Sequence, residues 1–163
     1  RNVVDLHGVL SDVRCLGCDR RVARTEFQAV LERCNPDWRA AVTAIGPDGD
    51  SRLATDDFRD FNVPACDRCD GILKPDVVFF GEPVPAPRVA RAAGFVTAAD
   101  ALLVVGSSLM VFSGFRFARM AQAAGLPIAI VNRGVTRADA MAVLRLSGDC
   151  ATVLAESVAG IGA

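Results

Sequence analysis

The chain has 163 residues, of which 52% are hydrophobic and 23% are charged, and its formal net charge is −1 at pH 7. This composition suits one folded domain, or one domain with a small insert, and excludes a disordered chain. The near-neutral charge argues against a nucleic-acid partner, because binding to nucleic-acid phosphates requires a basic protein surface. No apolar run of the sequence reaches the roughly 18 residues that a membrane-spanning helix needs, so we expect no membrane partner either.

Apolar runs and helix-like segments alternate along the chain. Strands are expected at 3–6, 77–80, 101–105, 128–131 and 143–146. Helices are expected at 89–99, 114–124 and 151–158. Because strands alternate with helices, the segments predict βαβ units and an α/β fold with a parallel, Rossmann-like sheet. We place residues 1–12 and 77–163 in this sheet domain and residues 13–76 in a small inserted domain.

Two local patterns describe the insert. The residues Thr25-Glu26-Phe27-Gln28 match a capping box, which predicts a short helix through Leu31 toward Cys34. Residues 35–61 are rich in proline, aspartate and glycine, and we expect them to form a loop.

The six cysteines separate into two pairs and two single residues. The pairs are Cys15-x-x-Cys18 and Cys66-x-x-Cys69, and each is followed by polar turn residues. Together they offer four thiolates, a complete tetrahedral set for structural zinc. Disulfides and a redox dithiol are the alternatives. Of the single residues, Cys34 is expected to be a small buried hydrophobe.

His7 is the only histidine in the chain, and it follows the expected strand at 3–6 directly. Four thiolates already complete the coordination of a zinc ion, so His7 is not needed as a ligand. A single histidine at a strand end is either structural or catalytic, and the residue pattern alone leaves both possibilities open.

Small and polar residues follow three of the expected strands. They are His7-Gly8, Gly106-Ser107-Ser108 and Asn132-Arg133-Gly134. Ligands of parallel α/β sheets bind at the carboxyl ends of the strands, where glycine allows close approach and serine and asparagine offer hydrogen bonds. Such an edge suits a nucleotide, although any one of these stretches alone is more typical of an ordinary turn.

Taken in order, these stretches resemble the sirtuin family of NAD-dependent protein deacylases. The stretch DLHGVLSDVRCLGC is similar to the family's catalytic histidine-glycine and first zinc pair, and CDRCDGILKPDVVFFGE is similar to the second zinc pair and the substrate-binding strand. LLVVGSSLMV and IAIVNRG resemble two NAD-binding strand ends, and SGDCATVL resembles the segment that closes over the adenine. The long segment between the cysteine pairs, the Gly-Ser-Ser loop and the NRG sequence resemble the class II, mitochondrial-type members.

The resemblance implies a role for each matched residue. His7 would be the general base, which takes a proton from a ribose hydroxyl after the acyl oxygen of a modified lysine has displaced nicotinamide. One structural zinc ion would be bound by Cys15, Cys18, Cys66 and Cys69. NAD, the co-substrate, would be bound by Gly106, Ser107, Ser108, Asn132, Arg133, Gly134 and Cys150. The substrate, an acylated lysine in a protein or peptide, would pair by strand addition with Val78, Phe79, Phe80 and Gly81.

The activity that the resemblance implies is transfer of the acyl group from a protein lysine to ADP-ribose, with release of nicotinamide. The family's glycine-rich GAGxS-like loop and QNxD-like stretch do not occur in the sequence, and the family's order would place both before Arg1. We therefore expect the chain to be the carboxyl-terminal part of such an enzyme, inactive and poorly soluble alone.

The resemblance also implies a location for the protein, which would be cytoplasmic in a bacterium or mitochondrial in a eukaryote. A zinc-ribbon binding module and a C-x-x-C thiol oxidoreductase are the two alternative functions.

Overall fold

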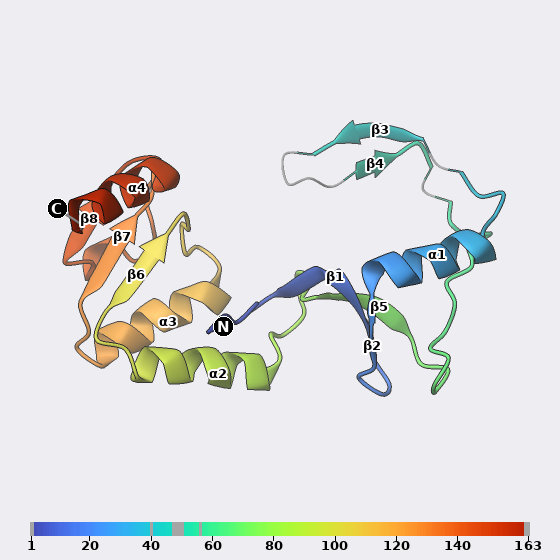
Figure 1. The fold of residues 1–163 in the computed structure, drawn as a ribbon, viewed down its shortest axis with the longest axis horizontal. Helices are drawn as coiled ribbons and strands as arrows, with labels where there is room; N and C mark the ends of the chain where they lie inside the picture. The colour runs from blue at the N-terminus through green and yellow to red at the C-terminus, as the bar shows by residue number, and fades with distance from the viewer. Residues whose placement is uncertain (1, 40, 47–50, 56, 162–163) are drawn as a thin grey trace. The chain divides into compact units, whose positions relative to one another are not determined.

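The computed structural model of the protein describes residues 2–39, 41–46, 51–55 and 57–161. The chain packs into two compact units, whose elements are labelled in Figure 1. The sheet unit comprises Arg1–Leu6 and Pro83–Ala163, and the cysteine unit comprises His7–Glu82. The domain bounds expected from the sequence stay a prediction. None of the described helices is long and apolar enough to cross a membrane.

The sheet unit is built on three parallel strands, as the alternation of strands and helices predicts. The strands are β6 (Leu102–Val105), β7 (Ile128–Val131) and β8 (Leu144–Leu146), hydrogen-bonded in the order β6-β7-β8. The helices are α2 (Ala86–Thr97), α3 (Phe112–Ala123) and α4 (Cys150–Ile161), with a short 3-10 helix at Asp139–Met141. β7 has the bounds expected from its apolar run, and the other elements expected between residues 89 and 158 differ from the observed ones at either end by three residues or fewer.

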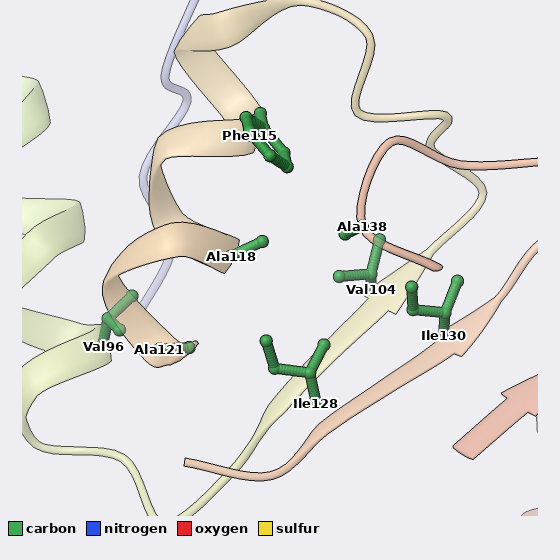
Figure 2. Packing of buried hydrophobic residues seen from close by; sticks show 8 residues of the cluster. All are labelled: Val96, Val104, Phe115, Ala118, Ala121, Ile128, Ile130 and Ala138. Atoms are coloured by element: carbon green, nitrogen blue, oxygen red, sulfur yellow. The ribbon is translucent and has the colours of Figure 1, made fainter. Parts of the chain in front are cut away.

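The core of the sheet unit lies between the strands and the helices α2 and α3 (Figure 2). From α3, Phe115, Ala118 and Ala121 point toward Ile128 and Ile130 of β7. Ala121 and Ile130 are completely buried. The small alanines let the helix approach the sheet closely, and burying an isoleucine side chain contributes about 1.5–3 kcal/mol. This packing fixes the strands, so the loops that follow them are held at one edge.

The cysteine unit contains a three-stranded antiparallel sheet. Its elements are β1 (Gly8–Cys15) in the middle, β2 (Arg21–Ala23) and β5 (Leu73–Val77) beside it, the helix α1 (Arg24–Cys34), and the hairpin of β3 (Val42–Ile45) and β4 (Ser51–Leu53). α1 packs against β1 and β2. Pro75 lies on β5, which is an edge strand, and proline is tolerated there because one side of the strand forms no ladder bonds.

A buried carboxylate joins all three strands of this sheet. Asp76 of β5 is 3% exposed, and its carboxylate oxygens lie 2.6 Å from a guanidinium nitrogen of Arg21 on β2 and 3.7 Å from one of Arg14 on β1. Removing one partner of such a buried pair leaves an uncompensated charge, which costs about 3–5 kcal/mol. The alignment of the three strands is therefore fixed by charge as well as by backbone hydrogen bonds.

Two of the strands expected from the sequence are wrong. Residues 3–6 form no strand, and the chain enters β1 only at Gly8. Of the run 77–80, only Val77 belongs to a strand, and that strand pairs antiparallel with β1 instead of joining the parallel sheet. The run ends in a turn at Phe79–Glu82, closed by a 3.0 Å hydrogen bond from the Glu82 N–H to the Phe79 carbonyl. An uninterrupted apolar run thus leads into an exposed turn, since Phe80 is fully exposed.

Three expectations for the insert are also wrong. β2 runs directly into α1, so the helix begins at Arg24 with Ala23 as its N-cap, and Thr25 lies inside the first turn where it forms no capping box. Cys34 is exposed at the end of α1 rather than buried. The stretch 35–61 contains the hairpin β3-β4 where a loop is expected, and residues 40, 47–50 and 56 of that stretch lie outside the described residues.

Candidate functional site

Each cysteine pair lies on a tight turn of the same kind. In each turn the N–H of the following aspartate donates to the carbonyl of the first cysteine, and the N–H of that cysteine donates to a carbonyl beyond the turn. The bonds are Asp19 N to Cys15 O at 3.1 Å, Cys15 N to Arg20 O at 2.8 Å, Asp70 N to Cys66 O at 2.8 Å and Cys66 N to Gly71 O at 2.9 Å. Both aspartates have positive φ, 58° at Asp19 and 55° at Asp70, a conformation that aspartate tolerates better than most residues.

The two turns bring four sulfurs into one cluster. The sulfurs of Cys15, Cys18, Cys66 and Cys69 all lie within 4.8 Å of one another. The separation is 3.5 Å between Cys15 and Cys69 and 3.8 Å between Cys18 and Cys66. A tetrahedral zinc ion with Zn–S bonds of about 2.3 Å needs sulfurs about 3.8 Å apart, whereas a disulfide bond measures about 2.05 Å. The cluster is therefore positioned to bind a zinc ion, and four thiolates leave no open position for water.

The thiols of the cluster influence one another's ionisation. Burial raises the pKa of Cys15, but hydrogen bonds from the backbone N–H groups of Cys18 and Gly17, together with those of the Cys69 and Cys18 thiols, outweigh burial and lower that pKa to about 7. The backbone N–H of Gly71 lowers the pKa of Cys69, but the neighbouring thiols of Cys18 and Cys15, together with burial, raise it to about 12. Thiolates packed this closely need a cation between them, and a divalent metal supplies the charge that lets all four ionise.

Gly71 lies directly against the sulfurs. A Cβ atom at this position would be 2.9 Å from the sulfur of Cys15 and 3.1 Å from the sulfur of Cys69, closer than van der Waals contact allows. At Gly17 the nearest sulfur, that of Cys69, would be 3.4 Å away, at the edge of ordinary contact. A methyl group at position 71 would therefore displace the sulfurs, whereas position 17 has room for one.

His7 lies at the entrance to β1. The residue is exposed, and the next residue, Gly8, has a φ of +84°, which few residues other than glycine adopt. The carbonyl oxygen of His7 accepts a hydrogen bond from the N–H of Val78 at 2.8 Å. The structure thus brings the predicted catalytic residue together with the first residue of the predicted peptide-binding stretch.

His7 and the sulfurs lie at opposite ends of β1. Gly8 begins this strand and Cys15 ends it. The ladder pairs Gly8 with Val77 and Cys15 with Leu73, and these two partners on β5 are four residues apart, which spans roughly 13 Å of extended chain. A metal ion at the cysteine cluster would therefore lie too far from His7 to take part in chemistry there. This position suits a structural metal rather than a catalytic one.

The remaining predicted site residues gather at the carboxyl edge of the parallel sheet. Gly106 follows β6, its N–H donates to the Val131 carbonyl at 2.9 Å, and a Cβ at this glycine would lie 3.5 Å from the sulfur of Cys150. Asn132 follows β7, and its N–H donates to the Leu146 carbonyl of β8 at 3.1 Å. The ends of all three strands and the start of α4 therefore meet at one edge.

The loop after β6 is held in a strained conformation. Gly106 has a φ of 63° and Leu109 a φ of 55°, and the second value is unusual for a leucine. The hydroxyl of Ser107 accepts the Leu109 N–H at 3.3 Å, and the carbonyl of Ser108 accepts the Arg137 N–H at 2.8 Å. Backbone strain of this kind concentrates at ligand-binding and active sites, because it persists only where the surroundings enforce it.

Asp149 is a residue of this edge that the sequence prediction missed. Its carboxylate accepts hydrogen bonds from the Thr152 N–H at 3.1 Å and the Thr152 hydroxyl at 3.2 Å, and it contacts the Arg133 guanidinium at 2.6 Å. The bonds from Thr152, and the charge of Arg133, hold the pKa of Asp149 below its usual value. The carboxylate thus ties the loop after β7 to the start of α4. An aspartate close before a helix is an N-cap signal, and Asp149 lies two residues before the expected helix 151–158, which is the pattern that would have identified it.

The predicted site residues therefore fall into two groups. His7, the four clustered cysteines and residues 78–81 belong to the cysteine unit, whereas residues 106–108, 132–134 and Cys150 belong to the sheet unit. Fold and site together define an α/β protein with a parallel sheet, loops that meet at its carboxyl edge and four clustered cysteines positioned to bind a metal ion.

The chain was compared with known protein families, curated proteins and solved structures. Residues 1–113 match the Sir2 family. An NAD-dependent protein deacetylase of Xanthomonas campestris pv. campestris (strain 8004) is 58% identical over 153 residues, which make up 94% of this chain and 52% of that protein. The NAD-dependent protein deacylase Sirt4 of Drosophila melanogaster is 46% identical over 154 residues, 94% of this chain and 49% of that protein. A solved structure described as "Sir2-p53 peptide-NAD+" has a TM-score of 0.72 at 26% identity and covers 98% of this chain and 55% of its own.

The chain belongs to the Sir2 family, since the family match covers more than half of its residues. The resemblance to sirtuins that the sequence motifs indicate is thereby confirmed. The chain spans about half the length of the curated relatives it matches.

The geometry of the cluster predicts one zinc ion per chain. Replacing any one of the four cysteines with serine should lose the metal and destabilise the cysteine unit, because the binding free energy of a structural metal is also folding free energy. The measurements are elemental analysis and thermal unfolding of the purified chain. Cys34→Ser, outside the cluster, is the control and should keep both properties. A chain without zinc, or with these sulfurs in disulfides, would contradict the prediction. The four variants are Cys15→Ser, Cys18→Ser, Cys66→Ser and Cys69→Ser.

The two glycines at the cluster predict a contrast between two alanine variants. Gly71→Ala forces a methyl group against two sulfurs, and overpacking of about 1–3 kcal/mol should weaken zinc affinity by roughly ten- to a hundredfold. Gly17→Ala should bind zinc nearly as tightly as the wild type. Competition with a chromophoric chelator measures both affinities. Equal affinities for the two variants would show that the cluster is not packed as the structure has it.

Proposed function

We propose that this chain contributes the histidine, zinc-binding and NAD-binding parts of an NAD-dependent protein-lysine deacylase, which transfers the acyl group from lysine to ADP-ribose and releases nicotinamide. The observation that carries the proposal is membership of the Sir2 family over residues 1–113. The relatives from Xanthomonas and Drosophila bear the names deacetylase and deacylase, so the proposal is made for acyl groups in general. The family match favours this function over a zinc-ribbon binding module or a thiol oxidoreductase.

His7 is the proposed general base. Its side chain is exposed, as a residue that meets a substrate must be, and its backbone contacts Val78 at the start of the proposed peptide-binding stretch. Imidazole gains and loses a proton near neutral pH, which suits removal of a proton from a ribose hydroxyl. In this role His7 acts on the co-substrate, while the remote cysteine cluster has only a structural part.

NAD is the proposed co-substrate, and it supplies the ADP-ribose that accepts the acyl group. Support comes from the carboxyl edge of the sheet, where strand ends, a strained loop and the start of α4 converge. Support also comes from the similar solved structure whose description includes NAD+ and a p53 peptide. The residues proposed to bind NAD are Gly106, Ser107, Ser108, Asn132, Arg133, Gly134 and Cys150.

The stretch Val78–Gly81 is the proposed site for the acylated peptide. Phe80 is fully exposed and Phe79 is half exposed, so this stretch is open to contact with an extended chain. An extended peptide that adds alongside such a segment gains main-chain hydrogen bonds regardless of its side chains.

We also propose a location for the protein in the cell. It acts in the cytoplasm if its source is bacterial, as that of the Xanthomonas relative is, and in mitochondria if its source is eukaryotic.

The direct test of the proposed function measures nicotinamide release and peptide deacylation together. NAD and an acetylated peptide are supplied to the chain alone and to a chimera in which the amino-terminal part of the Xanthomonas relative precedes it. The chimera should release one nicotinamide for each peptide deacylated, and neither product should form without NAD. Deacylation without NAD would contradict the proposal. A chimera that binds zinc but forms neither product would favour the binding module, and disulfide reduction would favour the oxidoreductase.

Replacing the proposed base predicts a loss of turnover without a loss of structure. In the chimera, His7→Ala should lower kcat by about 10²–10⁴, the usual contribution of a positioned base. Zinc content and the unfolding temperature should not change. Leu10→Ala alters an exposed residue of the same strand and serves as the control, with turnover near the wild-type value. Near-normal deacylation by His7→Ala, or failure of that variant to fold, would restore the structural interpretation of His7.

A further inference from the structure

The stretch 78–81 ends in an exposed turn. The Glu82 N–H donates to the Phe79 carbonyl at 3.0 Å, and Gly81, inside the turn, has a φ of +90°. Phe80 at its tip is fully exposed and Phe79 is half exposed. Exposed segments with little packing open and close readily, so such a turn keeps one conformation only if its ends are fixed.

The side chain of Glu82 connects the two ends of the turn. Its carboxylate accepts the backbone N–H of Phe79 at 3.1 Å. The same carboxylate accepts a hydrogen bond from the Lys74 ammonium group at 2.8 Å. The Lys74 nitrogen also lies 4.7 Å from the centroid of the Phe79 ring. Lys74 therefore contacts the residue that begins the turn and the residue that ends it.

Lys74 is anchored on a rigid element. It lies on β5, its side chain is only 17% exposed, and it is paired across the ladder with Arg14 of β1. Two cations directly opposite each other repel, so the carboxylate of Glu82 stabilises this part of the sheet as well as the turn. The hydrogen bond from Lys74, the N–H of Phe79 and the charge of Arg14 keep the pKa of Glu82 below its usual value. Glu82 is therefore ionised at neutral pH and able to hold both partners.

We propose that Lys74 and Glu82 are positioning residues for the acylated peptide. The ion pair holds the turn Phe79–Glu82 in the conformation that presents the backbone of Val78–Gly81 to an added strand. The inference rests on the proposed function and adds to it a pair of side chains that touch neither NAD nor the reacting atoms. Loss of either charge frees the turn, which weakens peptide binding and leaves the acyl-transfer step unchanged once the peptide is bound.

The conformation of the turn is tested first, on the chain as it is. Hydrogen exchange of the Phe79 amide, measured by NMR, should be slow in the wild type and at least fivefold faster in Lys74→Met and Glu82→Gln. Lys74→Arg keeps the charge and should retain protection. Because Lys74 is the only lysine in the chain, labelling with [15N]lysine gives a single side-chain signal. That signal should shift in Glu82→Gln and not in Arg59→Met, which breaks a separate exposed ion pair of the same unit.

The effect on peptide binding is tested in the chimera. Lys74→Met should raise the KM for an acetylated peptide by roughly tenfold, equivalent to about 1.4 kcal/mol, with kcat and the KM for NAD within twofold of the wild type. Lys74→Arg should restore the peptide KM, and Arg59→Met should not change it. A role limited to stability would instead lower the amount of active enzyme, which reduces apparent kcat and leaves the peptide KM unaltered.

The two readouts separate failure of this inference from failure of the proposed function. Unchanged exchange of the Phe79 amide in Lys74→Met, or an unchanged peptide KM, overturns the inference even if the enzyme is a deacylase. A raised peptide KM with unchanged exchange also overturns it, because the effect would then not pass through the turn. A wild-type chimera that deacylates no peptide overturns the proposed function and, with it, the peptide-binding part of the inference. The Phe79 exchange rates still decide whether the ion pair holds the turn.

Discussion

The antiparallel pairing of β1 with β5 is the constraint on which the cysteine unit depends. Because the two strands run in opposite directions, His7 before β1 meets Val78 after β5, while Cys15 at the other end of the ladder lies opposite Leu73. A slip of one residue would turn every side chain of one strand to the opposite face and break the bond between His7 and Val78. The position of His7 beside the proposed peptide-binding stretch is therefore a consequence of strand register.

Two interactions away from His7 set that register. The cysteine cluster joins the chain at the end of β1 to the chain before β5, because each turn supplies two of the four sulfurs. Asp76 fixes the middle of the sheet through arginines on β1 and β2. Between Gly8 and Val13 the ladder is irregular, so the end that carries His7 cannot fix itself by regular pairing. A metal with no open coordination position can thus contribute to a proposed reaction at the far end of the strand, by holding two strands in register.

Sequence reasoning succeeded where a local rule decides the structure. The spacing of the cysteine pairs identified the cluster because a C-x-x-C turn presents both sulfurs to one point whatever fold surrounds it. The bounds of strand β7 were also predicted correctly, since its apolar run is bounded by a proline before it and by Asn132 after it. Prediction failed where residues distant in the sequence decide the outcome. The run 77–80 is as apolar as β7, yet Val77 pairs antiparallel with the distant residue Gly8 of β1, and the chain then turns at Phe79–Glu82 instead of continuing as a strand of the parallel sheet.

The two groups of proposed site residues are held by interactions of different strength. In the cysteine unit, a metal site and a buried carboxylate enforce the register, and each costs several kcal/mol to break. At the carboxyl edge of the sheet, the loop after β7 is held by exposed contacts. Arg133 is 77% and Asp149 46% exposed where they pair, and an exposed pair of this kind contributes at most about 1 kcal/mol.

Weak contacts at the carboxyl edge have a consequence for α4. The N-cap bonds that Thr152 donates to the Asp149 carboxylate contribute about 1 kcal/mol to the start of this helix. The same helix start places the sulfur of Cys150 against Gly106. The loop after β7 and the start of α4 therefore open at a lower free energy than the core strands beneath them. The loop after β7 and the start of α4 can accordingly be reordered at less cost than the core strands, whereas two stronger interactions hold the strand register beside His7.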